Sequence, residues 1–128
     1  MTIVSHTLRV IQHFTERNPD LIFYIENPRG KLRSLPLFRG LDRATVTYCK
    51  YGDKRMKPTD IWTNNLAEHQ GFGWRPRKMC FVGNPDCHHE QCHRGRLCGV
   101  QGMQNAYERS KIPAALAREV IIAAERQN

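Results

Sequence analysis

The second half of the chain contains a stretch that cannot build an ordinary hydrophobic core. Residues 65–108 show no sustained apolar period, and they hold most of the cysteines, histidines and glycines. Four thiols and three imidazoles fall in one part of this stretch: Cys80, Cys87, His88, His89, Cys92, His93 and Cys98. A small loop-rich segment with little apolar content needs a cross-link to fold, and a zinc ion bound by cysteine and histidine provides one. The sequence therefore predicts a zinc site in this segment.

The spacing ranks the metal ligands without fixing the set. The best candidates are Cys80 and Cys87, then His88 and Cys92, with His93 and Cys49 as alternatives. Six residues separate Cys80 from Cys87, unlike the tight Cys-x2-Cys pair of a zinc ribbon. Free cysteines beside exposed histidines are the competing interpretation.

Length and charge limit the function. The chain of 128 residues suits one domain, and its net charge of +8 favours a polyanionic partner, nucleic acid before membrane. Between Arg29 and Lys57 there are nine basic residues and two acidic ones, which concentrates +7 in less than a quarter of the chain. This concentration predicts a surface that faces phosphates, against the alternative of a merely soluble basic surface.

Apolar runs of the kind that membranes require are missing from the sequence. The longest runs, 21–25 and 120–124, have five residues each, whereas a membrane helix needs about 20. The N-terminal residues lack the apolar core of a signal peptide. We therefore expect no membrane partner and a cytoplasmic, reducing location, where cysteines serve as metal ligands or core residues.

The pattern of apolar residues predicts an α/β fold. Residues 3–17 have helical spacing, and the apolar run 21–25 is typical of a strand buried on both faces of a parallel sheet. Residues 44–49 and 60–63 predict a hairpin, and residues 110–126 predict a final helix with Pro113 in its first turn. The chain thus begins with a crossover helix and no strand before it.

Glu26 follows the apolar strand directly. Ligands of open α/β sheets bind at the carboxyl ends of the strands, where a partly desolvated carboxyl group can share a proton with a ring nitrogen. The alternative is a carboxylate that accepts hydrogen bonds from loop N–H groups.

Three short motifs follow one another in a family order. They are Glu26-Asn27-Pro28 after the strand, Tyr51-Gly52 followed by Arg55, Lys57 and Thr59, and Ser110-Lys111-Ile112-Pro113 before the last helix. Together they resemble the DNA cytosine-5 methyltransferases, and residues 48–65 resemble most closely a phage-type branch, which implies a phage- or prophage-encoded protein. The resemblance implies the second half of a Rossmann-like methyltransferase sheet, built from 1–64 and 109–128, with residues 65–108 as a small recognition insert.

The resemblance also implies roles for single residues. Glu26 would orient the flipped cytosine, and Ser110 would help to wall the pocket of the methyl donor, S-adenosylmethionine. The residues implied to contact the substrate or DNA are Asn27, Arg29, Arg55, Lys57 and Thr59.

Two parts of the family pattern are missing. No cysteine follows a proline, as the nucleophile of the family does, and no glycine-rich donor loop follows a predicted strand. We therefore expect a chain that is inactive alone, either one subunit of a split enzyme whose partner protein supplies the N-terminal half or a truncated remnant. The alternative is a non-enzymatic zinc- and DNA-binding module.

Overall fold

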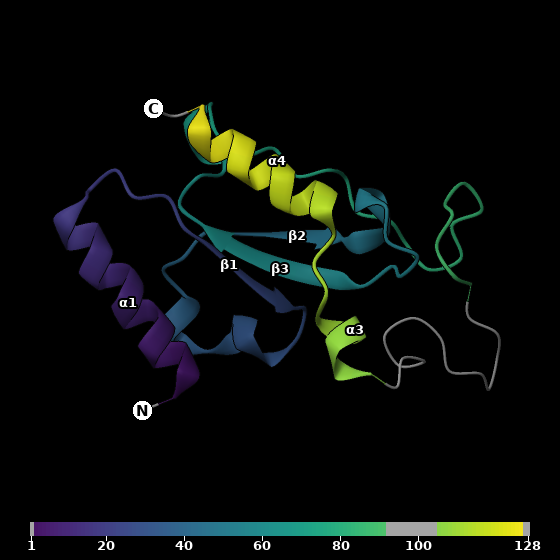
Figure 1. Ribbon diagram of the computed structural model, residues 1–128, viewed down its shortest axis with the longest axis horizontal. Helices are drawn as coiled ribbons and strands as arrows, with labels where there is room; N and C mark the ends of the chain where they lie inside the picture. The colour runs from purple at the N-terminus through teal and green to yellow at the C-terminus, as the bar shows by residue number, and fades with distance from the viewer. Residues whose placement is uncertain (1, 92–104, 127–128) are drawn as a thin grey trace.

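A computed structural model describes residues 2–91 and 105–126, which form a mixed α/β structure (Figure 1). The helices are α1 (Ile3–Arg17), α2 (Ala67–Gln70), α3 (Ala106–Ser110) and α4 (Ala114–Glu125). The strands are β1 (Tyr24–Pro28), β2 (Arg43–Thr47) and β3 (Pro58–Thr63). Three 3-10 turns connect them: η1 (Lys31–Ser34), η2 (Pro36–Phe38) and η3 (Tyr48–Tyr51).

The three strands form one antiparallel sheet in the order β1-β3-β2. Glu26 pairs with Ile61 on one side of β3, and Ala44 pairs with the same Ile61 on the other side. Because β1 and β2 both run antiparallel to β3, they run in the same direction as each other, and their carboxyl ends lie at the same end of the sheet. The candidate metal centre described below lies at that end.

The expected strand over 21–25 is wrong in its pairing, its position and its burial. The strand begins at Tyr24, it pairs antiparallel with β3, and its residues Tyr24 to Asn27 are only partly buried. The strand that is buried after its first residue is β3, because it is central and both of its faces are covered. The apolar run overlaps β1 only at Tyr24 and Ile25, because the strand continues into Glu26, Asn27 and Pro28, which an apolar pattern does not mark.

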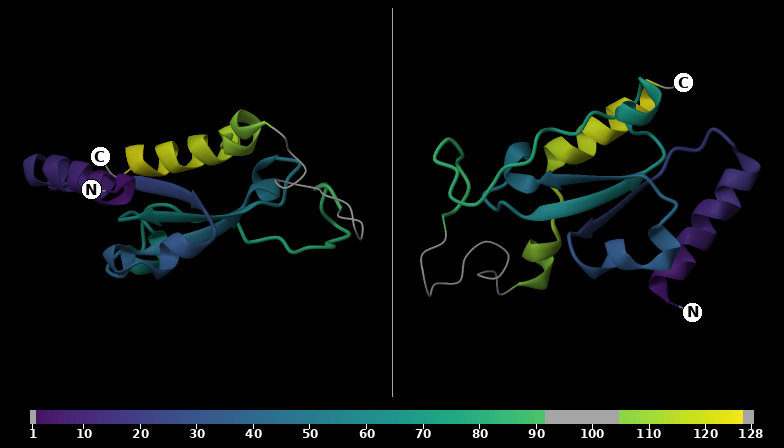
Figure 2. Two further views of the ribbon diagram at one scale, coloured as in Figure 1. Left: turned by 90° about the horizontal axis from the view of Figure 1, so that it is seen from below. Right: turned by 180° about the vertical axis from the view of Figure 1, so that it is seen from behind.

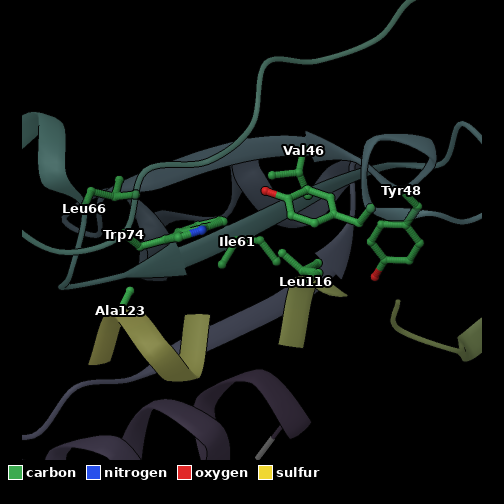
Figure 3. Close-up of a cluster of buried hydrophobic side chains, with 8 residues drawn as sticks. Val46, Tyr48, Ile61, Leu66, Trp74, Leu116 and Ala123 are labelled. Carbon is green, nitrogen blue, oxygen red and sulfur yellow. The ribbon is translucent and has the colours of Figure 1, made fainter. Parts of the chain in front are cut away.

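Helix α4 covers one face of the sheet and closes the core (Figure 2). Leu116 and Ala123 of α4 pack with Ile61 of β3, as Figure 3 shows. The other members of this cluster are Val46, Tyr48, Tyr51, Leu66 and Trp74. Leu66 and Trp74 fall within the segment predicted as an insert, yet they belong to this core. The predicted final helix is confirmed from Ala114, with Pro113 as its N-cap residue.

The opposite face of β3 packs on a 3-10 turn. Alternate residues of a strand point to opposite faces, so Trp62 lies away from α4 and its ring meets Phe38 of η2 at 4.7 Å between centroids. On this face Asp60 is fully buried, and its carboxylate accepts hydrogen bonds from Arg33 at 2.6 Å and Thr45 at 2.8 Å. Arg33 belongs to the basic segment predicted to face phosphates, but its guanidinium neutralises a buried carboxylate.

Helix α1 has the predicted bounds 3–17. Thr2 is its N-cap residue, and the Thr2 hydroxyl accepts a hydrogen bond from the Ser5 amide at 3.1 Å. None of its residues is buried, and Val10 and Phe14 are 41% and 53% exposed. The helix lies at the margin of the sheet (Figure 1). Among the described residues, no helix has the length and apolar character needed to cross a membrane.

Candidate metal centre and strand-end site

Four possible metal ligands converge beside η3. The sulfur atoms of Cys49, Cys80 and Cys87 and a ring nitrogen of His89 all lie within 4.8 Å of one another. Cys49 comes from η3, and the other three come from the loop after residue 79. Cys49, Cys80 and His89 are buried, and Cys87 is partly buried. Three sulfurs and one imidazole nitrogen make a ligand set that could hold a metal ion.

Local hydrogen bonds hold this loop against the sheet. The amide of Cys80 donates to the Thr47 hydroxyl at 2.8 Å, which fixes the loop to the end of β2. Gly83 has φ +79°, a conformation that side chains disfavour, and this turn brings the chain back toward Cys80. The amide of the buried Asn84 side chain then donates to the Cys80 sulfur at 3.2 Å.

The environment separates the protonation states of two thiols. Burial raises the pKa of Cys49 to about 12, and a hydrogen bond with Cys87 adds to this effect. Burial also acts to raise the pKa of Cys80, but hydrogen bonds from Asn84, Cys87 and Cys49 outweigh it and lower that pKa. The surroundings therefore favour the thiolate form at Cys80 more than at Cys49.

The predicted ligands meet this cluster only in part. Cys80 and Cys87 lie in it, and so does the alternative Cys49. His88 does not: it is exposed, and its Nε2 lies 2.8 Å from the Cys49 carbonyl oxygen. Its neighbour His89 occupies the ligand position instead. Cys92 and His93 lie outside the described residues.

A second group of predicted residues meets beside β1 and the start of η3. Glu26 does not follow the strand as expected, because β1 continues to Pro28 and Glu26 is its middle residue. The Tyr48 hydroxyl donates to the Glu26 Oε1 atom at 2.9 Å. The Lys57 Nζ atom lies 5.3 Å from the centre of the Tyr48 ring and donates to the Arg109 carbonyl at 2.8 Å. Burial and the Glu26 charge raise the pKa of Tyr48, and burial lowers the pKa of Lys57. Tyr48 was not predicted, because its contact with Glu26 joins residues far apart in sequence.

Arg55 lies in this group, but it is 2% exposed and faces inward. Its guanidinium forms an ion pair with Asp53 and donates to the carbonyl groups of Glu108, Arg109 and Lys111, at 3.2, 3.1 and 3.1 Å. These hydrogen bonds tie the β2–β3 connection to α3 and to Lys111, the residue after it. The contact with DNA that the sequence suggested does not fit a guanidinium that is buried in this way.

The remaining predicted residues surround this edge without forming a common pocket in the described structure. Thr59 is fully buried, and its hydroxyl lies 3.3 Å from the Lys57 carbonyl. The Asn27 side chain donates to the Pro28 carbonyl at 3.1 Å, and Arg29 is exposed. The Ser110 hydroxyl donates to the Tyr107 carbonyl at 2.8 Å, at the end of α3.

The described residues define a small mixed α/β protein with a Cys3His cluster at one end of its sheet. Comparisons of the chain with protein-family models, curated proteins and solved structures each gave no match.

Proposed function

We propose that this chain is the C-terminal part of a DNA cytosine-5 methyltransferase, in which it binds DNA and orients the flipped cytosine. The observation that carries the proposal is the Tyr48–Glu26 hydrogen bond of 2.9 Å, which joins the middle of β1 to the residue that follows β2. These strands would belong to the second half of a Rossmann-like sheet, with α4 on one face. The carboxyl ends of its strands are the edge where such sheets bind ligands.

The contacts of Glu26 suit the recognition of a base. Tyr48 occupies Oε1, and in the described part of the chain no hydrogen bond reaches Oε2. The free oxygen is available to the ring nitrogen and the exocyclic amine of a cytosine, the edge by which flipped bases are read. Lys57 places a positive charge beside the same group, which suits the phosphate of that nucleotide.

The partner protein would complete the enzyme. In this proposal it supplies the nucleophilic cysteine and the glycine-rich loop, and S-adenosylmethionine supplies the methyl group when it is bound. The residues of this chain then hold the base and its backbone, and Ser110 lies beside the turn that leads into α4.

The Cys3His cluster would hold zinc in a structural role. Four protein ligands complete a tetrahedral site and leave no position open for a substrate, as in structural zinc sites. Cys49 follows Tyr48 directly in η3, so the metal would also steady the tyrosine that holds Glu26. We expect about one zinc per chain by elemental analysis of reduced, purified protein. A metal-free protein with unchanged protease resistance in the 80–89 loop would contradict this role.

A non-enzymatic zinc- and DNA-binding module is the second candidate. The observation that favours it is the burial of Arg55 and Thr59, which removes two of the expected substrate contacts from the surface. In that case the surface around Glu26 would bind DNA and would take part in no methyl transfer.

A binding experiment with the chain alone tests the base-orienting role. Two DNA duplexes are compared by fluorescence anisotropy, one with a paired cytosine and one with the same cytosine opposite an abasic site. An unpaired base costs less to flip, so the wild type should prefer the second duplex. Glu26→Gln should remove this preference, while Glu16→Gln, an exposed control on α1, should keep it. Equal affinity of the wild type for both duplexes would contradict the base-orienting role.

Activity then separates the two candidates. The chain alone should transfer no methyl group to DNA, and the pair formed with a neighbouring reading frame that carries the missing motifs should do so. Glu26→Gln should slow the pair by about 10²–10⁴-fold, the usual contribution of a positioned acid or base. Binding without transfer in the complete pair would favour the non-enzymatic module.

A further inference from the structure

An arginine-lined groove runs along one side of α4, between this helix and residues 73–77, and has a volume of about 580 Å³. Four arginines line it: Arg75, Arg77, Arg118 and Arg126. Trp74 and Ala123 also line it, and both are buried, so the floor of the groove is part of the core.

Of the four arginines, Arg77 alone has a carboxylate partner in the described part of the chain. The Arg77 Nε atom donates to Glu119 at 3.1 Å, and the Glu119 carboxylate also accepts hydrogen bonds from Tyr51 at 2.7 Å and Trp74 at 2.9 Å. Glu119 is thus fully used by the core. Within the described ranges, no carboxylate pairs with the guanidinium groups of Arg75, Arg118 and Arg126. Four arginines and one glutamate leave the groove with a charge of +3.

The positive charges are spread along the groove. Arg118 and Arg126 are two turns apart on one face of α4, about 12 Å along the helix axis. Ile122 lies between them on the same face and lines the groove. A single phosphate ion would meet only one end of this row, whereas a nucleic acid backbone carries charges along its whole length.

We propose that the arginine groove binds the phosphodiester backbone of DNA. The inference rests on the proposed function, because that function makes DNA the partner. The groove would add a contact with DNA that is separate from the surface around Glu26. Guanidinium groups match phosphate oxygens with paired hydrogen bonds, and those without a carboxylate partner break no internal ion pair when they bind. The basic segment 29–57 cannot direct all of its positive charge toward DNA, because Arg33 and Arg55 pair with carboxylates of the protein.

The test is a salt titration of DNA binding with matched variants. Arg118→Ala with Arg126→Ala removes two charges from the groove, and Arg9→Ala with Arg17→Ala removes two from α1. Affinity for a 20-base-pair duplex is measured by fluorescence anisotropy at several salt concentrations. The groove variant should bind about tenfold or more weakly, and its log–log salt slope should fall by about 1.8, or 0.9 for each phosphate that is no longer neutralised. The α1 variant should keep the wild-type slope.

Three further results would overturn the inference in distinguishable ways. Equal slopes for the two variants would remove the groove from the DNA interface and leave the proposed function standing. A wild type that binds no duplex would overturn both proposals. Full displacement of the duplex by inorganic phosphate or a mononucleotide at micromolar concentration would assign the groove to a small phosphate ligand instead. If Glu26→Gln abolishes the preference for the unpaired cytosine and keeps the salt slope, the result would support two separate contacts.

Discussion

The β2–β3 hairpin and helix α1 differ most in how deeply they are buried. Every residue of β3 after Pro58 is buried, whereas no residue of α1 is. Both segments have regular secondary structure, so secondary structure alone does not hold a segment to the rest of the protein. The hairpin is held by the burial of its apolar surface and by ion pairs that neutralise carboxylates inside the protein. Substitutions in the hairpin and its contacts should therefore be far more costly than substitutions in α1.

The largest effect is expected at Arg55. Arg55→Ala leaves Asp53 without its partner and removes the donor to carbonyl groups of α3 and Lys111, so it should lower the free energy of unfolding by about 3–5 kcal/mol. Arg55→Lys should have a free energy of unfolding between those of the wild type and Arg55→Ala, because lysine keeps the charge but cannot donate to several carbonyl groups at once. Urea denaturation followed by circular dichroism measures both variants.

The adjacent Lys54 provides the control for Arg55. Its ion pair with Glu90 has a length of 3.6 Å, and the two side chains are 65% and 45% exposed. An exposed pair of this kind contributes less than about 1 kcal/mol. If Lys54→Ala and Arg55→Ala had equal effects, the contact between the hairpin and α3 would contribute nothing to stability.

The next effect concerns the packing of α4 on β3. Leu116 is 2% exposed and contacts the core cluster, so Leu116→Ala should cost about 3 kcal/mol, within the range for buried leucines. Ile121 on the same helix is 55% exposed, and Ile121→Ala should cost less than about 1 kcal/mol. A similar cost at both positions would show that a further surface covers the outer side of α4 in solution.

Sequence reasoning found what depends on local pattern. The apolar period of residues 3–17 gave the bounds of α1, and the number of sulfur atoms near residue 80 pointed to the cluster that contains Cys80 and Cys87. It did not fix what depends on the approach of distant segments. Cys49 was ranked only as an alternative, although η3 places it beside the returning loop, and His89, which lies in the cluster in place of His88, was not predicted.

The basic segment shows the same limit for charge. Its net charge is a property of the sequence, but the direction of each side chain depends on the sheet. Arg33 lies opposite Asp60, which is 27 residues away in sequence. Asp53 is only two residues from Arg55, but the sequence does not show that this pair is turned into the protein. The arginines that line the groove come from outside the basic segment, from residues 73–77 and from α4 with its C-cap residue.

The pair of Arg33 and Asp60 makes a pH-dependent contribution to the hairpin. Burial acts to raise the pKa of Asp60, but hydrogen bonds from Arg33 and Thr45 outweigh it and lower that pKa. A lowered folded-state pKa contributes stability that is present above the unfolded value near 3.9 and is lost as pH falls through the folded value. Arg33→Ala should cost about 2 kcal/mol at pH 7, somewhat less than a fully buried pair, because the Arg33 side chain is 31% exposed.

Unfolding by urea at pH 7 and at pH 3.5 measures this contribution. The difference between the wild type and Arg33→Ala should shrink at the lower pH, where Asp60 of the variant is protonated. Arg39→Ala removes an exposed arginine from the same segment and should show no such change. A difference that is independent of pH would contradict the role of the Asp60 charge.

The smallest effect is expected in α1. Phe14→Ser should change the free energy of unfolding by less than about 0.5 kcal/mol, because the side chain is 53% exposed and phenylalanine and serine have similar helix propensities. Leu8→Ser, at a partly buried position of the same helix, should cost more, by about 1 kcal/mol. Both are measured by urea denaturation, with helix content followed by circular dichroism. A large destabilisation at Phe14 would mean that this ring is covered in solution, and the contrast between α1 and the hairpin would then describe the isolated chain alone.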